Sequence, residues 1–384
     1  MFKAIVGHST DVDSEDAIAE ILDHCQSQLG NQLPQAGLLF AAMNFDYPLI
    51  VKRIQTTFPD IQLIGCTTDG EMSSVQGFQE DSIHLTLFCS DTVTIHAGLG
   101  QTLSDDAQAA ANQAIDSLKL NNLQAIKLCL VLPDGLADGT EVALRQLQSK
   151  LPPNTPIIGG LAGDQYQFQK TLQFYQGEVV HNGLPILVFC GDSLKLSHGV
   201  ASGWHPLSRT AIVTKANREI VHEIDHQPAV QFFQEYTGQQ PIYGEYPLAV
   251  FEKDSDQFYL RASNQWDLDT NSIHFMGEVP EQAKVQITYA THDQIITAAK
   301  SSIQQAVDNY PGQQPAVAFL ISCAARRWIL GVRAQEEYAL GKQFLDPALP
   351  IMGFYAYGEI APLKMQGQSF YHQETLVTLL LGVD

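Results

Sequence analysis

The feature that most constrains the fold is a short pattern that occurs three times along the chain. Each copy is an apolar run of strand character that ends at a glycine, passes through small, hydroxylated or aromatic residues, and closes on a second glycine followed by an acid. The copies are LIGCTTDGEM (63–72), IIGGLAGDQ (157–165) and IMGFYAYGEI (351–360). Because glycine adopts backbone angles that other residues avoid, we predict a tight turn with the acid at its mouth. The first glycines are Gly65, Gly159 and Gly353, and the closing pairs are Gly70-Glu71, Gly163-Asp164 and Gly358-Glu359.

The flanking sequences repeat as well. Each copy follows an apolar strand (GLLFAAM, KLCLVLP or AVAFLIS) and a helix-like segment, and precedes an apolar strand that ends in LFCSD, VFCGD or LLGVD. We therefore predict a unit of strand, helix, strand, glycine-acid loop and hairpin strand, used three times with insertions of different length. This pattern indicates a mixed α/β (α+β) protein in two lobes, with mixed sheets and with the glycine-acid loops lining one or more ligand pockets.

Composition narrows the range of partners and locations. The 384 residues carry a formal net charge of -21, from 21 basic and 42 acidic side chains, which would repel nucleic acids and anionic membranes. Small molecules or proteins are the expected partners. The six cysteines form no CxxC pair and lie mostly in apolar strands, which is typical of reduced core residues. Because there is no signal-peptide core and no apolar run of ~20 residues, we expect a cytoplasmic protein.

A domain boundary is predicted in the stretch TAIVTKANREIVHEIDHQPAVQFFQEYTG. It alternates polar and apolar residues up to Ile224, turns at 225–226, and enters a helix with Pro228 in its first turn and Gly238 at its end. We place the boundary between residues 222 and 223, which gives domains 1–222 and 223–384. The string HEIDH (222–226) matches the HExxH zinc motif, but on a strand its histidines would lie about 13 Å apart, too far to share one zinc.

The sequence does not assemble a nucleophile with a base, so we expect no enzymatic activity. The glycine frames carry glutamate where a phosphate-binding loop needs lysine, and no GxSxG elbow is present. Cys66 follows a strand-end glycine and could be reactive, but its counterparts Gly160 and Phe354 could not be nucleophiles. A structural or binding role is therefore favoured for Cys66 and its neighbour Thr67.

Charged side chains suggest a ligand that carries both an amine and a carboxylate, as an amino acid does. SCAARRW (322–328) places two arginines at a strand-to-helix junction, and guanidinium is a preferred partner of carboxylates. If the acid of a glycine-acid loop faced the same cavity, it could bind the amine. The alternative is that these charges pair with each other across the fold. The predicted ligand-binding residues are Cys66, Thr67, Glu71, Asp164, Arg326, Arg327, Tyr355, Tyr357 and Glu359.

Several motifs together resemble the FIST family. They are GHSTDVDS, LIGCTTDGE, IIGGLAGD, the GW-P turn, the EID-x-x-PA junction, and GFYAYGEIAP with the tail YHQETLVTLLLG. The match covers nearly the whole chain. The resemblance implies a bacterial intracellular sensory module with FIST N-terminal and C-terminal domains that binds a small ligand. Because the sequence contains no transmitter, GGDEF or EAL segment, its expected partner is a separate histidine kinase, diguanylate cyclase or phosphodiesterase.

The same resemblance implies an alternative ligand, since some stand-alone members are similar to a haem-binding nitric-oxide sensor. Haem b would need an axial ligand, usually histidine, and a broad apolar pocket. His198 and His205, close to Trp204 in sequence, are candidates by residue type, as are His181 and His372.

Overall fold

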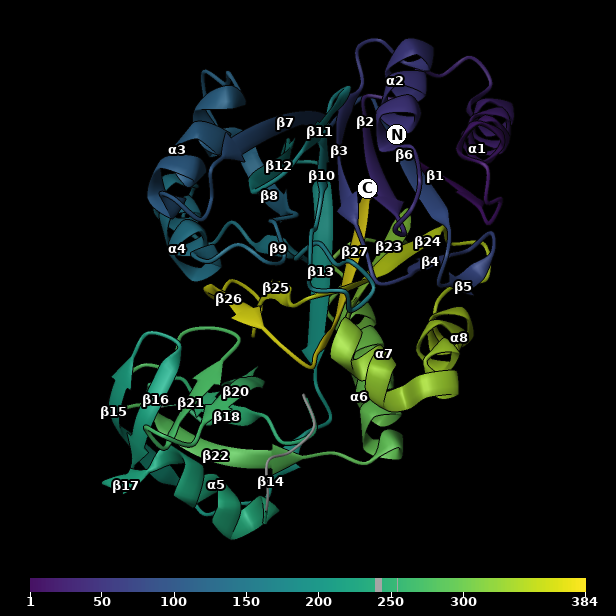
Figure 1. Cartoon of the computed structure of the whole chain (residues 1–384). Coiled ribbons are helices and arrows are strands. Elements are labelled where there is room, and N and C mark those ends of the chain that lie inside the picture. The colour runs from purple at the N-terminus through teal and green to yellow at the C-terminus, as the bar shows by residue number, and fades with distance from the viewer. Residues whose placement is uncertain (239–243, 254) are drawn as a thin grey trace.

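The predicted unit is present three times, in a longer form than expected. The computed structural model describes residues 1–238, 244–253 and 255–384. Each unit begins with an additional strand and helix, so it runs strand, helix, strand, helix, strand, hairpin, strand. The α+β class, the mixed sheets and the two-lobe layout are confirmed (Figure 1). All three units lie in the larger lobe, whereas the smaller lobe is an insertion in the third unit.

The elements of the units follow the same order. Unit 1 contains β1 (Phe2–Ser9), α1 (Ser14–Leu29), β2 (Ala36–Ala41), α2 (Tyr47–Thr57), β3 (Gln62–Thr67), β4 (Glu71–Ser73), β5 (Gly77–Gln79) and β6 (Ile83–Ser90). Unit 2 contains β7 (Thr94–Gln101), α3 (Ala107–Ser117), η1 (Leu123–Ala125), β8 (Ile126–Val131), α4 (Thr140–Lys150), β9 (Ile157–Gly160), β10 (Gln173–Tyr175), β11 (Glu178–Val180) and β12 (Gly183–Cys190). Unit 3 contains β13 (Leu194–Ala201), α6 (His292–Asp308), β23 (Val317–Cys323), α7 (Ala324–Leu330), η2 (Gly331–Arg333), α8 (Gln335–Phe344), β24 (Ile351–Ala356), β25 (Glu359–Pro362), β26 (Ser369–His372) and β27 (Leu376–Val383).

Each unit's sheet is completed by a hairpin from another unit. The strand orders are β1-β6-β2-β3-β10-β11, β7-β12-β8-β9-β25-β26 and β13-β27-β23-β24-β4-β5. The hairpin of unit 2 therefore extends the sheet of unit 1, that of unit 3 extends the sheet of unit 2, and that of unit 1 extends the sheet of unit 3. This cyclic exchange pairs backbone groups that a sheet edge would otherwise leave open.

The three sheets pack against each other on one face and under helices on the other. A single core cluster contains aromatic side chains from all three units: Phe40, Phe88, Phe189, Phe319 and Phe354. Helices α1 and α2, α3 and α4, and α6 and α8 cover the outer faces of the three sheets (Figure 1). Because both faces are buried, the strands are continuous apolar runs. Within the described residues, every helix is too short or too polar to cross a bilayer.

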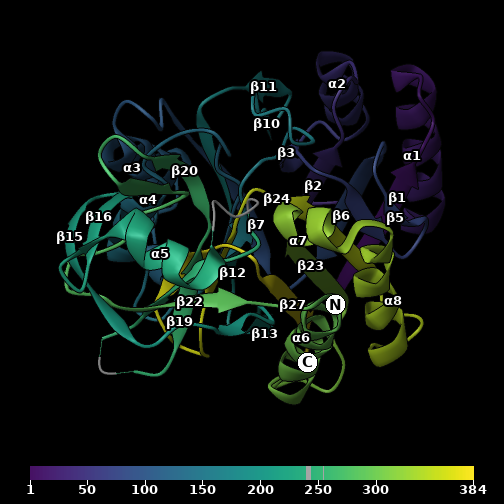
Figure 2. The ribbon, with the colours of Figure 1, turned by 60° about the horizontal axis from the view of Figure 1, so that its bottom comes forward.

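The smaller lobe is one sheet of nine described strands with a single helix. Its elements are β14 (His205–Pro206), β15 (Ala211–Asn217), β16 (Ile220–Ile224), β17 (Gln227–Pro228), α5 (Ala229–Thr237), β18 (Leu248–Phe251), β19 (Phe258–Arg261), β20 (Ser263–Asp267), β21 (Ser272–Phe275) and β22 (Lys284–Tyr289). Figure 2 shows α5 across the face of this lobe that is turned to the viewer. The strand ending at Ile224 and the helix ending before Gly238 match the sequence prediction. The predicted boundary between residues 222 and 223 lies within β16.

The first glycine of each repeat has a different role from the one predicted. Gly65, Gly159 and Gly353 lie inside β3, β9 and β24, not at the turn. A Cβ atom on them would lie 2.0, 1.8 and 2.4 Å from the carbonyl oxygens of Leu39, Val131 and Leu320 on the adjacent parallel strand. Close approach of two backbones therefore requires glycine here. The closing glycines Gly70 and Gly358 do have positive φ angles, of 125° and 152°, as a turn requires.

Replacing Gly159 with alanine should destabilise the protein, because the new methyl group would overlap the Val131 carbonyl. We expect the free energy of unfolding to fall by about 1–3 kcal/mol, the usual range for overpacking, in chemical denaturation. Gly177→Ala is the matched control, since its Cβ would come no closer than 3.6 Å to Gln55. Equal midpoints for the two variants would show that the close approach at Gly159 is not required.

Candidate functional site

The three repeated turns meet at the junction of the units. Backbone hydrogen bonds join Gly163 N to Thr67 O (2.8 Å), Leu161 N to Gly358 O (2.9 Å) and Asp69 N to Tyr355 O (3.0 Å). These bonds connect unit 2 to unit 1, unit 2 to unit 3, and unit 1 to unit 3, so they close a ring. The turns thus converge in space, but their acidic side chains have different surroundings.

Strand register shows which residues of the turns are equivalent. The residues after the repeated glycines are Phe354, Cys66 and Gly160, and they lie opposite Glu71, Gln173 and Glu359 in the exchanged hairpins. Gln173, and not Asp164, is therefore the counterpart of the two glutamates. From the sequence, Asp164 was matched to the two glutamates because unit 2 has a longer segment between β9 and β10.

Glu71 and its neighbours in unit 1 are satisfied inside the protein. Glu71 is fully buried and accepts hydrogen bonds from the hydroxyl groups of Thr68 and Ser82. Burial raises the pKa of Glu71 to about 8, although these hydrogen bonds oppose the shift. Cys66 lies in the central core, and Thr67 Oγ1 accepts a hydrogen bond from Leu172 N (3.0 Å). These predicted ligand-binding residues face protein atoms.

Asp164 organises the long turn of unit 2. Its carboxylate accepts hydrogen bonds from the backbone N–H groups of Phe168 (3.0 Å), Gln169 (2.7 Å) and Lys170 (2.9 Å), and from the Tyr357 hydroxyl. Burial opposes ionisation, but these donors lower the pKa of Asp164 below its ordinary value. Asp164 therefore fixes the shape of this long turn.

Arg326 is engaged entirely inside the large lobe. Its side chain is fully buried, with Nε 2.9 Å from Glu337 Oε1 and Nη2 3.0 Å from Ile295 O. Its Nη1 donates to the backbone oxygens of Ser202 and Glu374. Tyr355 Oη donates to the same Glu337 carboxylate at 2.9 Å. The guanidinium group thus joins separate segments of unit 3 and does not reach a ligand cavity.

Arg327 joins unit 3 to unit 1. Its guanidinium group lies 3.2 Å from Asp69 and 3.0 Å from Glu80. Burial raises the pKa of Asp69 to about 6, although Arg327 opposes the shift. Both arginines thus pair with acids of the protein, but not with the glycine-acid loop residues considered from the sequence. Their partners are Glu337, Asp69 and Glu80 and not the predicted Glu71 and Glu359.

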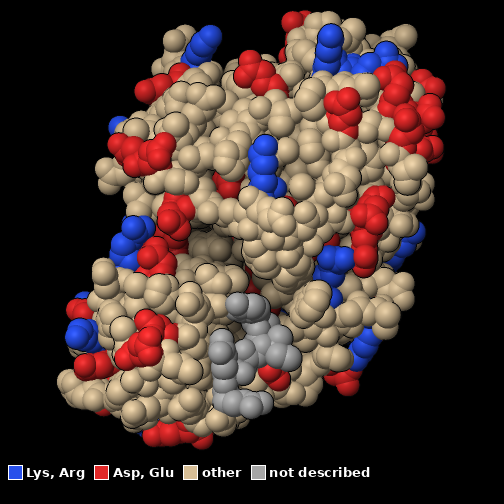
Figure 3. All heavy atoms as spheres, viewed as in Figure 1, with Lys and Arg blue, Asp and Glu red and all other residues tan. Residues whose placement is uncertain are grey.

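A cavity of about 260 Å³ lies where unit 2, unit 3 and the smaller lobe meet. Unit 2 contributes residues 135–141 and part of the long turn, and the smaller lobe contributes parts of β20 and β21. Unit 3 contributes residues 323–325, Tyr357, Tyr371, Gln373 and Glu374. Figure 3 shows the hollow between the two lobes, with acidic and basic side chains next to each other at its left edge. Of the nine residues predicted to bind the ligand, only Tyr357 is among those that line it.

Glu374 is the most unusual group in this cavity. Its side chain is fully buried, and neither carboxyl oxygen has a hydrogen-bond partner in the described part of the chain. Burial first, and the nearby Glu359 second, raise the pKa of Glu374 well above its usual range. Its φ angle of 60° lies in the left-handed region, which is costly for a residue with a side chain. Strain and an unsatisfied buried group together make Glu374 a candidate functional residue.

Glu359 lies next to this acid and is only half satisfied. One carboxyl oxygen accepts hydrogen bonds from Thr375 N (3.0 Å) and Thr375 Oγ1 (2.6 Å), and the other has no partner among the described residues. Burial raises the pKa of Glu359 to about 8, although the hydrogen bonds from Thr375 oppose the shift. Burial and the two carboxyl groups raise the pKa of the Cys323 thiol, which lines the cavity, well above its ordinary value. Two buried acids and a thiol with a raised pKa thus lie close together, and two of the three, Glu374 and Cys323, line the cavity.

One wall of the cavity is aromatic and strained. The Phe168 ring stacks on Tyr357 with centroids 5.1 Å apart, and Tyr166 lies edge-on to Tyr357 at 6.0 Å. Tyr166 and Phe168 have φ angles of 60° and 50°. Tyr166 N donates to the Tyr357 hydroxyl at 2.7 Å, which fixes the wall. The sequence analysis missed Tyr166, Phe168 and Glu374, although Glu374 lies in the YHQET string used for the family resemblance.

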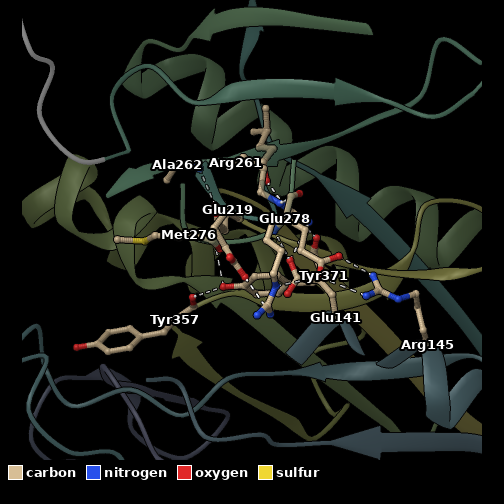
Figure 4. Close-up of polar contacts among 12 residues, drawn as sticks. Glu141, Arg145, Glu219, Arg261, Ala262, Met276, Glu278, Tyr357 and Tyr371 are labelled. Atoms are coloured by element: carbon tan, nitrogen blue, oxygen red, sulfur yellow. Dashed lines mark hydrogen bonds and ion pairs between the residues drawn. The ribbon is translucent and has the colours of Figure 1, made fainter. Parts of the chain in front are cut away.

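Arg261 attaches the smaller lobe to the larger one beside the cavity (Figure 4). Its Nη1 lies 2.8 Å from Tyr371 O in unit 3, and its Nη2 lies 3.3 Å from Glu141 in unit 2. Glu141 also accepts a hydrogen bond from Glu278 N at 2.8 Å, and Glu278 in turn pairs with Arg145 at 2.8 Å. Among the described residues, the ion pairs between the two lobes are therefore on the unit 2 side of the cavity.

None of the four histidines considered as haem ligands, His181, His198, His205 and His372, lines the cavity between the lobes. His198 is buried on β13, and its Nε2 donates to Pro362 O at 3.0 Å. His205 is exposed on β14, which belongs to the other lobe. His372 is buried, and its Nε2 lies 2.8 Å from Ala361 O. Among the described residues that line the cavity between the lobes there is no histidine.

Removing the Arg326 side chain should destabilise the protein strongly. Arg326→Ala leaves Glu337 buried without its counter-ion, which typically costs about 3–5 kcal/mol of the free energy of unfolding. Denaturant titration measures this loss. Arg333→Ala serves as the control, because Arg333 pairs with Asp293 and Glu336 at the surface and its removal should change little. Comparable losses for both variants would contradict the structural role of Arg326.

Stability should fall as the pH rises from about 6.5 to 8.5. The folded-state pKa of Glu71 is raised from 4.5 to about 8, so its stabilising contribution is full below about 4.5 and is lost as the pH passes 8. Buried histidines such as His8, with a pKa of about 4, act in the opposite sense only below about 6.5. Glu71→Gln should therefore show a smaller fall of Tm over this range. Parallel profiles for the two proteins would exclude a raised pKa at Glu71.

Comparison with known proteins gives sequence relatives along the whole chain. An uncharacterized protein of Mycobacterium tuberculosis is 24% identical over 99% of both chains, and one of Mycobacterium bovis is 23% identical over 99% of this chain and 98% of its own. An uncharacterized protein of Methanocaldococcus jannaschii is 28% identical over 56% of this chain. That match spans only 41% of the archaeal protein.

Two solved structures of cyanuric acid hydrolase show weak similarity. One, from A. caulinodans, matches with a TM-score of 0.29 and 9% identity over 53% of this chain and 72% of its own. The other matches with a TM-score of 0.38 and 8% identity over 100% of both chains. These scores are too low to support an argument about fold or function.

Family models give the identity. The FIST N domain matches residues 35–227, and the FIST C domain matches residues 229–362. The two matches follow each other along the chain and meet at the start of α5. The chain therefore belongs to the FIST family, whose domains are sensory modules of signal transduction.

Proposed function

We propose that this chain is a cytoplasmic signal-input module that binds an amine-bearing ligand of amino-acid size in the cavity between its lobes. The observation that carries the proposal is Glu374, a fully buried carboxyl group that lines the cavity and has no partner among the described residues. An unsatisfied buried acid costs stability, and a ligand N–H group would recover that cost. The amine that the sequence analysis assigned to Glu71 or Glu359 is thus assigned to Glu374.

The shape and lining of the cavity support this assignment. Its volume of about 260 Å³ is near the lower end of small-molecule sites, which suits a ligand of amino-acid size. The rings of Tyr166, Phe168 and Tyr357 line the same cavity as the acid and provide an aromatic wall. Most ligand sites combine such a wall with a few oriented polar groups.

A binding role is proposed in preference to catalysis. Cys323 is the thiol that lines the cavity, and burial together with the acid pair raises its pKa well above the ordinary value. A neutral thiol is a poor nucleophile. The other thiol considered from the sequence, Cys66, is buried in the central core, and burial raises its pKa as well.

Ligand binding would be transmitted through the arrangement of the lobes. A ligand in the cavity would touch units 2 and 3 of the larger lobe and β20 and β21 of the smaller one. Binding would therefore favour the lobe arrangement that closes on the ligand. A separate histidine kinase or cyclic-di-GMP enzyme is proposed to read that shift.

A thermal-shift screen of amino acids and amines tests the proposal. We expect at least one compound to raise the Tm of the wild-type protein, because a ligand at 100 times its Kd adds about 2.7 kcal/mol to the free energy of unfolding. Glu374→Gln should abolish the shift. Glu71→Gln is the control, since Glu71 is equally buried but does not line the cavity.

Two results would count against this function. One is a screen without any hit on the wild-type protein. The other is a hit that Glu374→Gln leaves unchanged, because the ligand would then bind elsewhere.

A further inference from the structure

The charges around the cavity restrict the ligand further than the proposed function does. The lining contains four acids, Asp138, Glu141, Glu219 and Glu374. Within the described residues, no lysine, arginine or histidine is part of the lining. A ligand carboxylate placed in this cavity would face these acids and would find no basic side chain in the described lining to pair with. Partial burial would increase the repulsion between the carboxylates.

The arginines nearest the cavity are already neutralised. Arg326 contacts the backbone oxygen of Glu374 at 3.3 Å, but its charge is matched by Glu337 at the same guanidinium group. Arg261 lies behind the cavity wall and pairs with Glu141. Glu219 has only the exposed Arg218 beside it, and Glu374 has no ion pair among the described residues. Asp138 and Glu374 are thus the lining acids without an ion pair among the described residues. Burial holds the pKa of Glu374 above its usual range, and a cation bound beside it would favour the ionised carboxylate, so Glu374 becomes a counter-ion when the cation binds.

The aromatic wall of the cavity also favours a cation. Aromatic faces attract ammonium and guanidinium groups within about 6 Å, and the attraction grows when water is excluded. Tyr166, Phe168 and Tyr357 lie along the cavity, and the Tyr166 hydroxyl and Thr140 Oγ1 are buried without a partner in the described structure. A ligand with several N–H donors could satisfy these oxygens together with Glu374.

We infer that the cavity selects an organic cation without a carboxylate, such as a decarboxylated amino acid, with Glu374 as its counter-ion and the Tyr166–Tyr357 wall against its apolar part. This inference rests on the proposed function and names the ligand class for that same cavity. Gly244 supports the assignment, because a Cβ there would lie 2.5 Å from Glu374 Oε1 and would crowd the carboxyl group.

Isothermal titration with two matched series tests the inference. Tyramine and agmatine are organic cations, tyrosine and arginine are their amino-acid parents, and tyrosol is the neutral analogue of tyramine. We expect at least one amine to bind the full-length protein about tenfold or more tightly than its parent, and tyramine to bind better than tyrosol. Glu374→Gln should weaken binding of that amine by about tenfold or more, whereas Glu71→Gln should not.

The outcomes separate the inference from the proposed function. If a parent amino acid binds as well as its amine, and Glu374→Gln abolishes that binding, the inference fails and the proposed function stands. If neither amine binds, or tyrosol binds as well as tyramine, the inference fails. The comparison of amine with parent uses only the wild-type protein, so it remains decisive if Glu374→Gln does not fold. An amine that binds equally well to Glu374→Gln would contradict both proposals.

Discussion

The large lobe depends on the cyclic exchange of hairpins among its three units. Each unit forms a four-stranded sheet whose last parallel strand, β3, β9 or β24, would have an open edge without the neighbouring hairpin. The exchange pairs all three edges at once. A single unit would have an exposed sheet edge, and the inner face of its sheet would lack the other two sheets that pack against it. The repeated glycines serve the same junctions, because they allow the parallel strands to approach closely where the hairpins pair.

The three junctions have the same geometry but different chemistry. At the start of the exchanged hairpin, Glu71 is satisfied by two hydroxyl groups, and Gln173 contacts Asp134 and Gly183 N. Glu359 has one satisfied oxygen and lies next to Glu374. This third junction borders the smaller lobe, so a cavity forms there between surfaces of three segments. The third junction therefore differs from the other two in having a half-satisfied acid next to the cavity-lining Glu374.

Sequence reasoning could recover the units because apolar strands and turn glycines are local signals. It could not identify the exchange of hairpins, since a strand's sequence does not specify which edge it joins. Two errors followed from reading the repeats only by alignment. Asp164 was matched to Glu71 although Gln173 holds that position, and Arg326 was given a ligand although its partner, Glu337, lies on α8. The amino-acid sequence around Glu337 does not distinguish a buried acid from a solvent-exposed one.

The site was harder to predict than the fold, because it is defined by a buried carboxyl group that lacks hydrogen-bond partners among the described residues. Glu374 becomes notable only when all neighbouring donors are seen to be used elsewhere, as Arg326 is by Glu337. It also lies beyond the region matched by the FIST C domain, which ends at residue 362. The aromatic wall was partly predicted through Tyr357, but Tyr166 and Phe168 depend on the left-handed turn that Asp164 holds.

The two matched family domains are not the two lobes, and this difference bears on signalling. The matches meet at residue 228, inside the smaller lobe, so each contributes strands to both lobes. Ion pairs through Arg261 and Arg145 fix the smaller lobe to unit 2 on one side of the cavity. Hydrogen bonds from Arg261 to Tyr371 O and between Gln373 and the smaller lobe already join unit 3 to that lobe, and a ligand held by Glu374 would add to them. The free energy available for a signal is then the difference in ligand affinity between the lobe arrangements that do and do not contact the ligand from both lobes.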